Sequence, residues 1–195
     1  MAAGAGRRGG APILTLDLDG VVCAPPFGRN VGIHRSFLDP SAPSGRARVP
    51  PPWFSAPADR LRFDFRRPLP EAGAALEALR RSRTLILLTG RRSSPLCWLR
   101  RHGLAELLDD LVINETPLSS PHFKCDAIAR LGAAEHIDDD GRTAQLLAQR
   151  SEAQPYLRDW PRNRGLPFDA GVRRVADLSE LATMLEQASG DGASE

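Results

Sequence analysis

The sequence predicts an α/β fold in which a central, mainly parallel sheet lies between two layers of helices. Short apolar runs alternate with segments of helical periodicity, which is typical of strands joined by crossover helices. The run from Leu85 to Leu88 is continuously apolar, as expected for a strand buried on both faces. At 195 residues and 42% hydrophobic, the chain can bury one sizeable core but has no room for two.

The expected elements follow the order of a Rossmann-like, three-layer α/β/α domain. Pro70 suits the first position of a helix and Asp177 suits an N-cap, so these residues mark the starts of two helices. Strands are predicted near Ile13 to Asp17, Thr84 to Thr89, Leu111 to Asn114, Glu135 to Asp138 and Pro155 to Asp159, and helices near Pro70 to Ser82, Ser94 to Arg101, Phe123 to Leu131, Arg142 to Arg150 and Asp177 to Glu186.

One domain is expected over residues 12–186, between a disordered arm at 1–11 and a disordered tail at 187–195. The first eleven residues are mainly Gly, Ala and Arg without an apolar stretch, which argues against a secretory signal. No apolar run approaches the length of a membrane span, so no membrane partner is expected. The odd number of cysteines, three, favours a reducing compartment, and we predict a cytoplasmic location. The net charge of +2 is too small to argue for nucleic acid by itself.

A proline-rich insert occupies residues 24–67. Prolines cannot donate to a sheet ladder and break helices, so the insert is predicted to be a short irregular lid rather than a full cap domain. A long ordered loop beside a site is often functional, although a plain surface insertion remains the alternative. The prolines are Pro25, Pro26, Pro40, Pro43, Pro50, Pro51, Pro52 and Pro57.

Two carboxylates end the first predicted strand. Successive side chains of a strand point to opposite faces, so Asp17 and Asp19 are expected on one face, with Leu16 and Leu18 on the other. Two like charges held close repel, unless a cation neutralises them or their pKa values are split for acid and base roles. The following Gly20 allows a tight turn. The alternative is a strand end with solvated aspartates.

A second apolar strand ends in Thr89, Gly90 and Arg91. In open α/β sheets ligands bind beyond the carboxyl ends of the strands, so Thr89 is expected beside Asp17. Its hydroxyl and the neighbouring backbone N–H groups could then contact a phosphate oxygen. Arg91 is the first choice among the arginines for a further anion contact, because a guanidinium fork suits phosphate.

Lys124 is the single lysine among 26 basic residues. A compact ammonium differs from a planar guanidinium, and a site that needs a point charge between a carboxylate and a phosphate would not accept arginine. The alternative is a solvated lysine near a helix start.

The fourth predicted strand ends in Asp138, Asp139 and Asp140, followed by a glycine. Adjacent carboxylates are unfavourable without a counter-charge, and clustered oxygens suit a hard cation such as Mg²⁺. A solvated acidic turn is the alternative when this segment is considered alone.

Together these pieces resemble the four signature motifs of the haloacid dehalogenase-like (HAD) superfamily of hydrolases, over about residues 12 to 150. The matching residues are Asp17-Leu18-Asp19-Gly20, Thr89-Gly90, Lys124 and Asp138-Asp139. Within that superfamily an aspartate two residues after the nucleophile marks phosphatases and phosphotransferases, whereas dehalogenases lack it. Asp19 therefore argues against carbon–halogen cleavage.

The resemblance implies roles for the catalytic residues. Asp17 would attack phosphorus and form an aspartyl-phosphate. Asp19 would protonate the leaving oxygen and then deprotonate the hydrolytic water. Lys124 would orient Asp17 and offset the crowded negative charge, while Thr89 and Gly90 would bind phosphoryl oxygens.

The resemblance also implies a Mg²⁺ cofactor. A carboxylate oxygen of Asp17, the backbone carbonyl of Asp19 and a carboxylate of the acidic cluster would hold it. Asp139 is the preferred direct ligand and Asp138 the second choice, because the triple aspartate leaves the register open. Asp140 is expected to belong to the outer shell or to the turn.

The end of the chain is weakly similar to the nucleotidase branch of the superfamily. The similarity rests on the stretch from Pro155 to Arg164 with its Pro-x-Asn turn, and on Gly171 to Val175. The expected partner is a phosphorylated small molecule, such as a nucleotide, or a phosphorylated macromolecule. The alternatives are a phosphotransferase with the same intermediate and a non-catalytic protein that binds a phospholigand. Nucleic-acid binding and the oligomeric state stay open.

Overall fold

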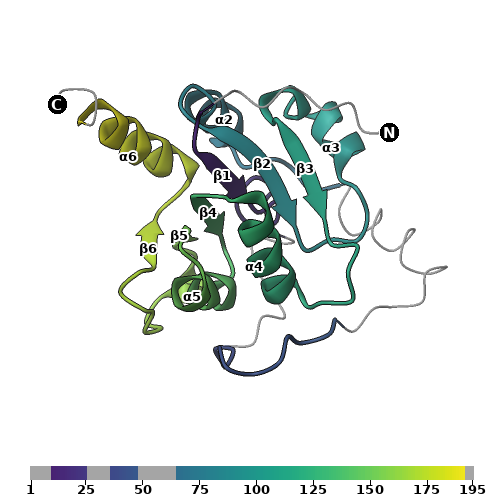
Figure 1. The fold of residues 1–195 in the computed structure, drawn as a ribbon. Helices are drawn as coiled ribbons and strands as arrows, with labels where there is room; N and C mark the ends of the chain where they lie inside the picture. The colour runs from purple at the N-terminus through teal and green to yellow at the C-terminus, as the bar shows by residue number, and fades with distance from the viewer. Residues whose placement is uncertain (1–9, 26–35, 48–64, 192–195) are drawn as a thin grey trace.

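The computed structural model describes residues 10–25, 36–47 and 65–191. Its centre is a six-stranded sheet with the strand order β3-β2-β1-β4-β5-β6, and every neighbouring pair is parallel (Figure 1). This is the doubly wound order, in which a ligand crevice forms where the strand order reverses, between β1 and β4. The strands are β1 (Ile13–Leu16), β2 (Thr84–Thr89), β3 (Asp110–Ile113), β4 (Glu135–Asp138), β5 (Gln154–Arg158) and β6 (Arg173–Val175).

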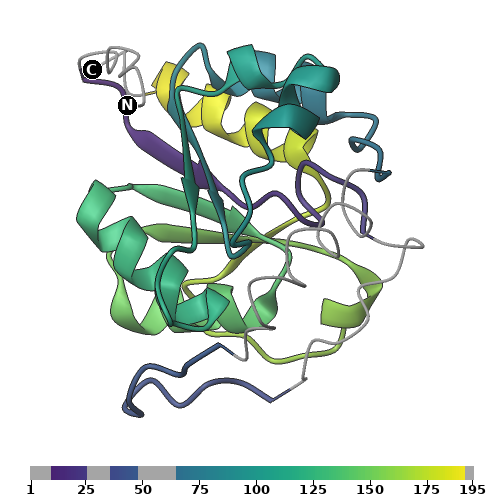
Figure 2. The same ribbon diagram turned by 90° about the vertical axis from the view of Figure 1, so that its right-hand side faces the viewer.

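Helices cover both faces of the sheet, as Figure 2 shows in side view. Helices α2, α3 and α6 contribute to one apolar cluster, and α4 and α5 contribute to the other. The expected three-layer α/β/α fold is therefore confirmed. The helices are α2 (Ala72–Leu79), α3 (Leu96–Arg101), α4 (Ser120–Leu131), α5 (Gly141–Arg150) and α6 (Leu178–Asp191), with short 3₁₀ helices η2 (Ala105–Leu107) and η3 (Pro161–Asn163).

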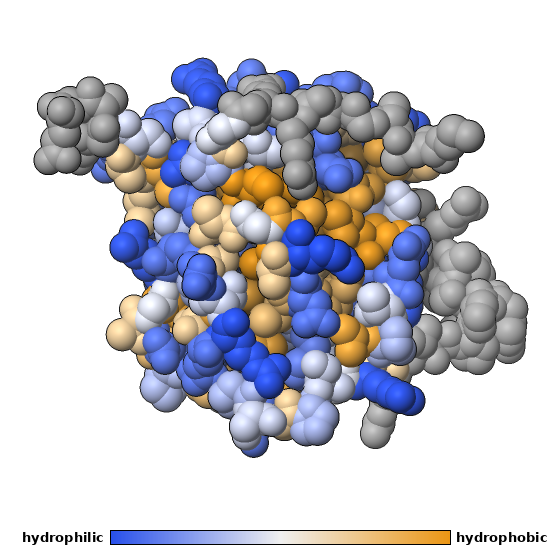
Figure 3. All heavy atoms as spheres, viewed as in Figure 1, coloured by the Kyte–Doolittle hydropathy of each residue, from blue (hydrophilic) through white to orange (hydrophobic). Residues whose placement is uncertain are grey.

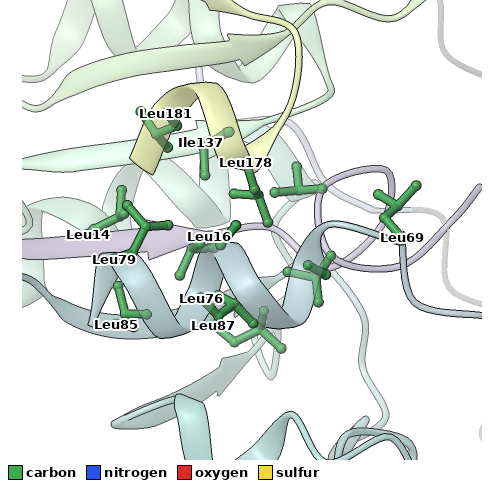
Figure 4. Packing of buried hydrophobic residues seen from close by; sticks show 14 of the residues in the cluster. Leu14, Leu16, Leu69, Leu76, Leu79, Leu85, Leu87, Ile137, Leu178 and Leu181 are labelled. Atoms are coloured by element: carbon green, nitrogen blue, oxygen red, sulfur yellow. The ribbon is translucent and has the colours of Figure 1, made fainter. Parts of the chain in front are cut away.

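The larger apolar cluster joins the central strands to α2 and α6. Leu14 and Leu16 of β1 pack among leucines of both helices, and all of these side chains are fully or almost fully buried (Figure 4). On the opposite face, Leu88 of β2 packs with Phe123 and Ile128 of α4. Burial on both faces explains the continuous apolar run of β2 from Leu85 to Leu88. The core thereby fixes the ends of β1, β2 and β4, where the polar motifs begin.

On the face that carries α4, apolar residues gather over β1, β2 and β3 (Figure 3). Partly buried Ile13 and Val112 pack there against the second cluster. Among the described helices, none is both long and apolar enough to cross a membrane.

Some boundaries differ from the expectation. Helix α6 continues to Asp191, five residues beyond the helix end expected at Glu186. A sixth strand, β6, extends the sheet beyond the five predicted strands. Within the proline-rich insert, residues 36–47 form no helix or strand, and Arg46 makes an isolated bridge to Leu118. Residues 1–9, 26–35, 48–64 and 192–195 lie outside the described part, so the arm and the complete lid stay predictions.

We expect Leu181→Ala to lower the free energy of unfolding by about 3 kcal/mol, since it leaves a cavity among fully buried side chains. Denaturant unfolding followed by circular dichroism measures the change. The control is Thr183→Ala on the exposed side of the same helix, which should stay within about 0.5 kcal/mol of wild type. Equal losses in the two variants would contradict the packing of α6 described above.

Candidate active site

The candidate site lies at the carboxyl ends of β1 and β4, the neighbouring strands at the centre of the sheet. Asp17 directly follows β1, and its N–H donates to the carbonyl of Ile137 at 2.9 Å. Asp138 ends β4 and Asp139 follows it. The carboxylates of Asp17, Asp138 and Asp139 are all buried, and each offers an oxygen within 4.8 Å of the others. Residues distant in sequence thus form one carboxylate cluster.

Lys124 connects the two strands from the first turns of α4. Its Nζ lies 2.9 Å from Oδ1 of Asp17 and 2.7 Å from Oδ2 of Asp138, and the residue is only 2% exposed. Burial alone disfavours the ammonium, but the charges of Asp138 and Asp17 hold the pKa of Lys124 above its ordinary value. Lys124 is therefore a fixed cation, and the sequence-based expectation of a point charge beside Asp17 agrees with this geometry.

The carboxylate of Asp138 has three polar contacts. Besides Lys124, Nε2 of buried His136 lies 3.3 Å from Oδ2 of Asp138, and the N–H of Asp140 donates to its Oδ1 at 2.9 Å. These contacts hold the pKa of Asp138 below its ordinary value even though burial opposes that shift. Burial lowers the pKa of His136, whose Nδ1 lies 2.8 Å from Oγ1 of Thr15. Asp138 is thus ionised and fixed in orientation.

The pKa values of Asp17 and Asp139 are raised, in contrast to the lowered pKa of Asp138. Burial raises the pKa of Asp17 to about 7, against the opposing charge of Lys124. Burial also raises the pKa of Asp139 well above its ordinary value, although Arg162 opposes the shift from 2.7 Å away. In the absence of a cation, burial therefore disfavours the ionised forms of Asp17 and Asp139, which lie beside the ionised carboxylate of Asp138. A bound cation would favour the ionised form of all three.

The donor set fits Mg²⁺. Hard divalent cations take oxygen ligands, mainly carboxylates and backbone carbonyls, and the cluster presents buried carboxylate oxygens close together. Both Asp138 and Asp139 belong to the cluster, so the choice of direct ligand stays open. Asp140 accepts from the N–H of Arg142 at 3.0 Å as the N-cap of α5, in agreement with its expected place in the turn.

Gly20 lies directly against the cluster. Its φ is +78°, and a Cβ built there would lie 1.7 Å from Oδ2 of Asp139. Both the left-handed backbone and the close approach require glycine. The loop after β1 and the loop after β4 are therefore in direct contact at this position.

Asp19 does not lie on the strand face on which the sequence pattern predicts it together with Asp17. Strand β1 ends at Leu16, so Asp17 and Asp19 lie in the following loop rather than on one strand face. Arg91 donates to the Asp19 carboxylate from Nε at 2.8 Å and from Nη2 at 2.5 Å, and Arg66 donates to it as well. Burial opposes ionisation, but the two guanidinium groups hold the pKa of Asp19 below its ordinary value. Asp19 is a paired carboxylate in this state.

Thr89 ends β2, which pairs with β1, and Gly90 follows it. Thr89 is buried, and its hydroxyl accepts from the N–H of Arg91 at 3.3 Å. A Cβ on Gly90 would lie 2.1 Å from Oγ of Ser120, at the start of α4. The β2 loop therefore contacts the helix that carries Lys124.

Sequence reasoning did not single out Arg66 or Arg162. Arg66 reaches Asp19 from the end of the proline-rich insert, and Arg162 reaches Asp139 from η3. Arginine supplies almost all of the 26 basic residues of this chain, so its presence alone gave no signal. The Pro-x-Asn turn around Pro161 was the one available indication for Arg162.

We expect Gly20→Ala to destabilise the protein more than Gly103→Ala. Gly103 has a similar φ of +68° but nothing within 4 Å of an added Cβ, so its variant measures the backbone penalty alone, about 1 kcal/mol. The clash with Asp139 should add about 1–3 kcal/mol, the usual cost of overpacking. Chemical unfolding of both variants measures the difference, and equal losses would show that the two loops are not in contact.

Comparisons with known proteins give matches by structure. No protein-family model and no curated protein sequence matches the chain. A magnesium- and phosphate-bound D,D-heptose 1,7-bisphosphate phosphatase from B. bronchiseptica is 18% identical with a TM-score of 0.57, covering 91% of this chain and 99% of its own. A haloacid dehalogenase-like hydrolase from Xanthomonas campestris is 12% identical with a TM-score of 0.56, covering 95% and 100%.

An L-2-haloacid dehalogenase from Xanthobacter autotrophicus is also similar, at 13% identity and a TM-score of 0.54, over 70% of this chain and 68% of its own. A phosphatase and a dehalogenase thus share the architecture, and the fold by itself does not select the reaction. At these identities the likeness establishes the fold, as the sequence resemblance had predicted. The chain has the fold of the haloacid dehalogenase-like hydrolases.

Proposed function

We propose that this protein is a Mg²⁺-dependent phosphatase that hydrolyses a phosphate monoester through an aspartyl-phosphate on Asp17. The observation that carries the proposal is the buried carboxylate of Asp17, fixed by Lys124 and grouped with Asp138 and Asp139 at the centre of the sheet. A buried carboxylate with an oriented oxygen is suited to covalent catalysis. The sequence motifs and the fold shared with a phosphatase support the same reading.

In the first step an oxygen of Asp17 attacks phosphorus, and the bond between phosphorus and the leaving oxygen breaks. The ammonium of Lys124 holds Asp17 in place and offsets negative charge in the transition state. Asp19 gives its proton to the leaving oxygen, which departs as an alcohol.

In the second step water attacks the phosphorus of the intermediate. Asp19 takes a proton from this water, the bond between phosphorus and Asp17 breaks, and inorganic phosphate leaves. Thr89 and the N–H groups around Gly90 would bind the phosphoryl oxygens throughout. Mg²⁺, held by Asp17, the carbonyl of Asp19 and Asp138 or Asp139, would supply positive charge to the phosphoryl group.

Asp19 must first leave its ion pairs in order to act as an acid. In this structure Arg91 and Arg66 keep it ionised. We infer that an anionic substrate competes for Arg91, which frees Asp19 to rotate and take up a proton. This exchange would couple substrate binding to the protonation of the acid.

The substrate class follows from the short insert and the basic surroundings. We propose a nucleotide or another phosphate ester, or a phosphorylated macromolecule whose own surface helps to exclude water.

The test is phosphate release from nucleotides, sugar phosphates, phosphopeptides and phosphorylated oligonucleotides, with Mg²⁺ and with a chelator. Asp17→Asn should abolish Mg²⁺-dependent release, because the amide is a poor nucleophile, while the variant stays folded. The matched control is Asp126→Asn, the same substitution at an exposed position of α4, which should keep wild-type activity. Full activity of Asp17→Asn would refute the aspartyl-phosphate.

A phosphotransferase would transfer labelled phosphate from the same intermediate to an added alcohol in preference to water. A non-catalytic binder would give neither phosphate release nor labelling of Asp17 in acid-quenched samples. These two outcomes separate the alternatives left open by the sequence.

A further inference from the structure

The turn that follows β5 contacts both loops of the carboxylate cluster. This segment, residues 158–163, is named the β5 bracket here; it runs from the end of β5 through the 3₁₀ helix η3. None of its residues belongs to the carboxylate cluster. Its contacts nevertheless reach the loop after β1 on one side and the loop after β4 on the other.

Two side chains of the bracket hold the β1 loop. Nε1 of Trp160 donates to the carbonyl of Gly20 at 2.8 Å, and Nη1 of Arg158 donates to the carbonyl of Val21 at 3.2 Å. The Arg158 guanidinium lies 4.9 Å over the Trp160 ring. Its Nη2 also pairs with Glu71 at 2.7 Å, which anchors it. Both bonds go to backbone carbonyls one and two residues after Asp19.

Two further side chains hold the β4 loop. The amide of Asn163 donates to the carbonyl of Asp139 at 3.0 Å and to the carbonyl of Arg158 at 3.2 Å. Asn163 is only 3% exposed. Arg162 contacts both the carboxylate and the carbonyl of Asp139. The bracket therefore fixes the backbone of a cluster residue as well as its side chain.

The spacing between the two loops leaves little freedom, because Gly20 already lies in contact with Asp139. A group that binds the backbone of both loops determines how far apart their carboxylates lie. Outer groups that orient metal ligands commonly change metal affinity 10–100-fold when they are lost.

We propose that Asn163 and Trp160 are positioning residues, which set the distance between the β1 and β4 loops and thereby the affinity of the cluster for a divalent cation. The proposal depends on the metal site of the proposed function. It does not depend on the reaction that the site performs.

The test is a titration of the purified protein with Mn²⁺, followed by the electron paramagnetic resonance signal of the free ion. Asn163→Leu keeps the approximate shape of the side chain but removes the amide that donates to the carbonyls of Asp139 and Arg158. We expect about tenfold weaker Mn²⁺ binding. Trp160→Phe keeps an aromatic ring near Arg158 but removes the indole N–H that binds the carbonyl of Gly20, so a smaller weakening is expected. Circular dichroism confirms that each variant is folded at the temperature used.

The matched control is Asn114→Leu. Asn114 is equally buried and its amide donates to a backbone carbonyl, that of Leu118, at 2.9 Å, but it lies after β3. The Asn114→Leu variant should lose about as much stability as Asn163→Leu, but its Mn²⁺ affinity should equal that of the wild type. If the enzyme is active, excess Mg²⁺ should restore the rate of Asn163→Leu, which a general loss of structure would not allow.

Unchanged Mn²⁺ affinity in Asn163→Leu and Trp160→Phe would overturn the proposal, and so would an equal weakening in Asn114→Leu. A wild type that binds no Mn²⁺ at millimolar concentration would overturn both the metal site and the bracket. A wild type that binds Mn²⁺ but releases no phosphate would remove the proposed phosphatase activity alone, and the comparison of affinities would still decide on the bracket.

Discussion

The ammonium of Lys124 between Asp17 and Asp138 is the interaction on which the site depends. These carboxylates end two neighbouring strands and are buried, so without a cation between them their repulsion would oppose the pairing of those strand ends. Lys124 reaches them because α4 begins at the same edge of the sheet. The fold therefore brings a charge from the helix layer to a point where the sheet alone would accumulate only negative groups.

Parallel strand order explains why the motifs meet. The carboxyl ends of β1, β2 and β4 lie at one edge. Apolar side chains pack on both faces of β1 and β2, whereas β4 packs through Ile137 on one face. The core thus supports the strand ends at which Asp17, Thr89 and Asp138 lie. The carboxylate cluster lies between β1 and β4, where the direction of the strand order reverses and ligands bind in open α/β sheets.

Much of this arrangement could be predicted because its residues stand out in the sequence. Asp17 and Thr89 end apolar runs, Asp138 belongs to a triple aspartate, and Lys124 is the single lysine. The ion pairs of Asp19 could not be predicted, since they depend on loop paths that bring Arg66 and Arg91 together. Strand β6 escaped prediction because a three-residue edge strand with two arginines carries almost no apolar pattern.

The two edges of the sheet have a consequence for association between molecules. One edge is β3, which begins with exposed Asp110, and the other is β6, in which Arg173 and Arg174 are exposed. Unpaired strand edges are templates on which another chain can add a strand, and short, charged edges discourage it. Both edge strands are short and carry exposed charges, a combination that disfavours the open-ended addition of strands from copy to copy.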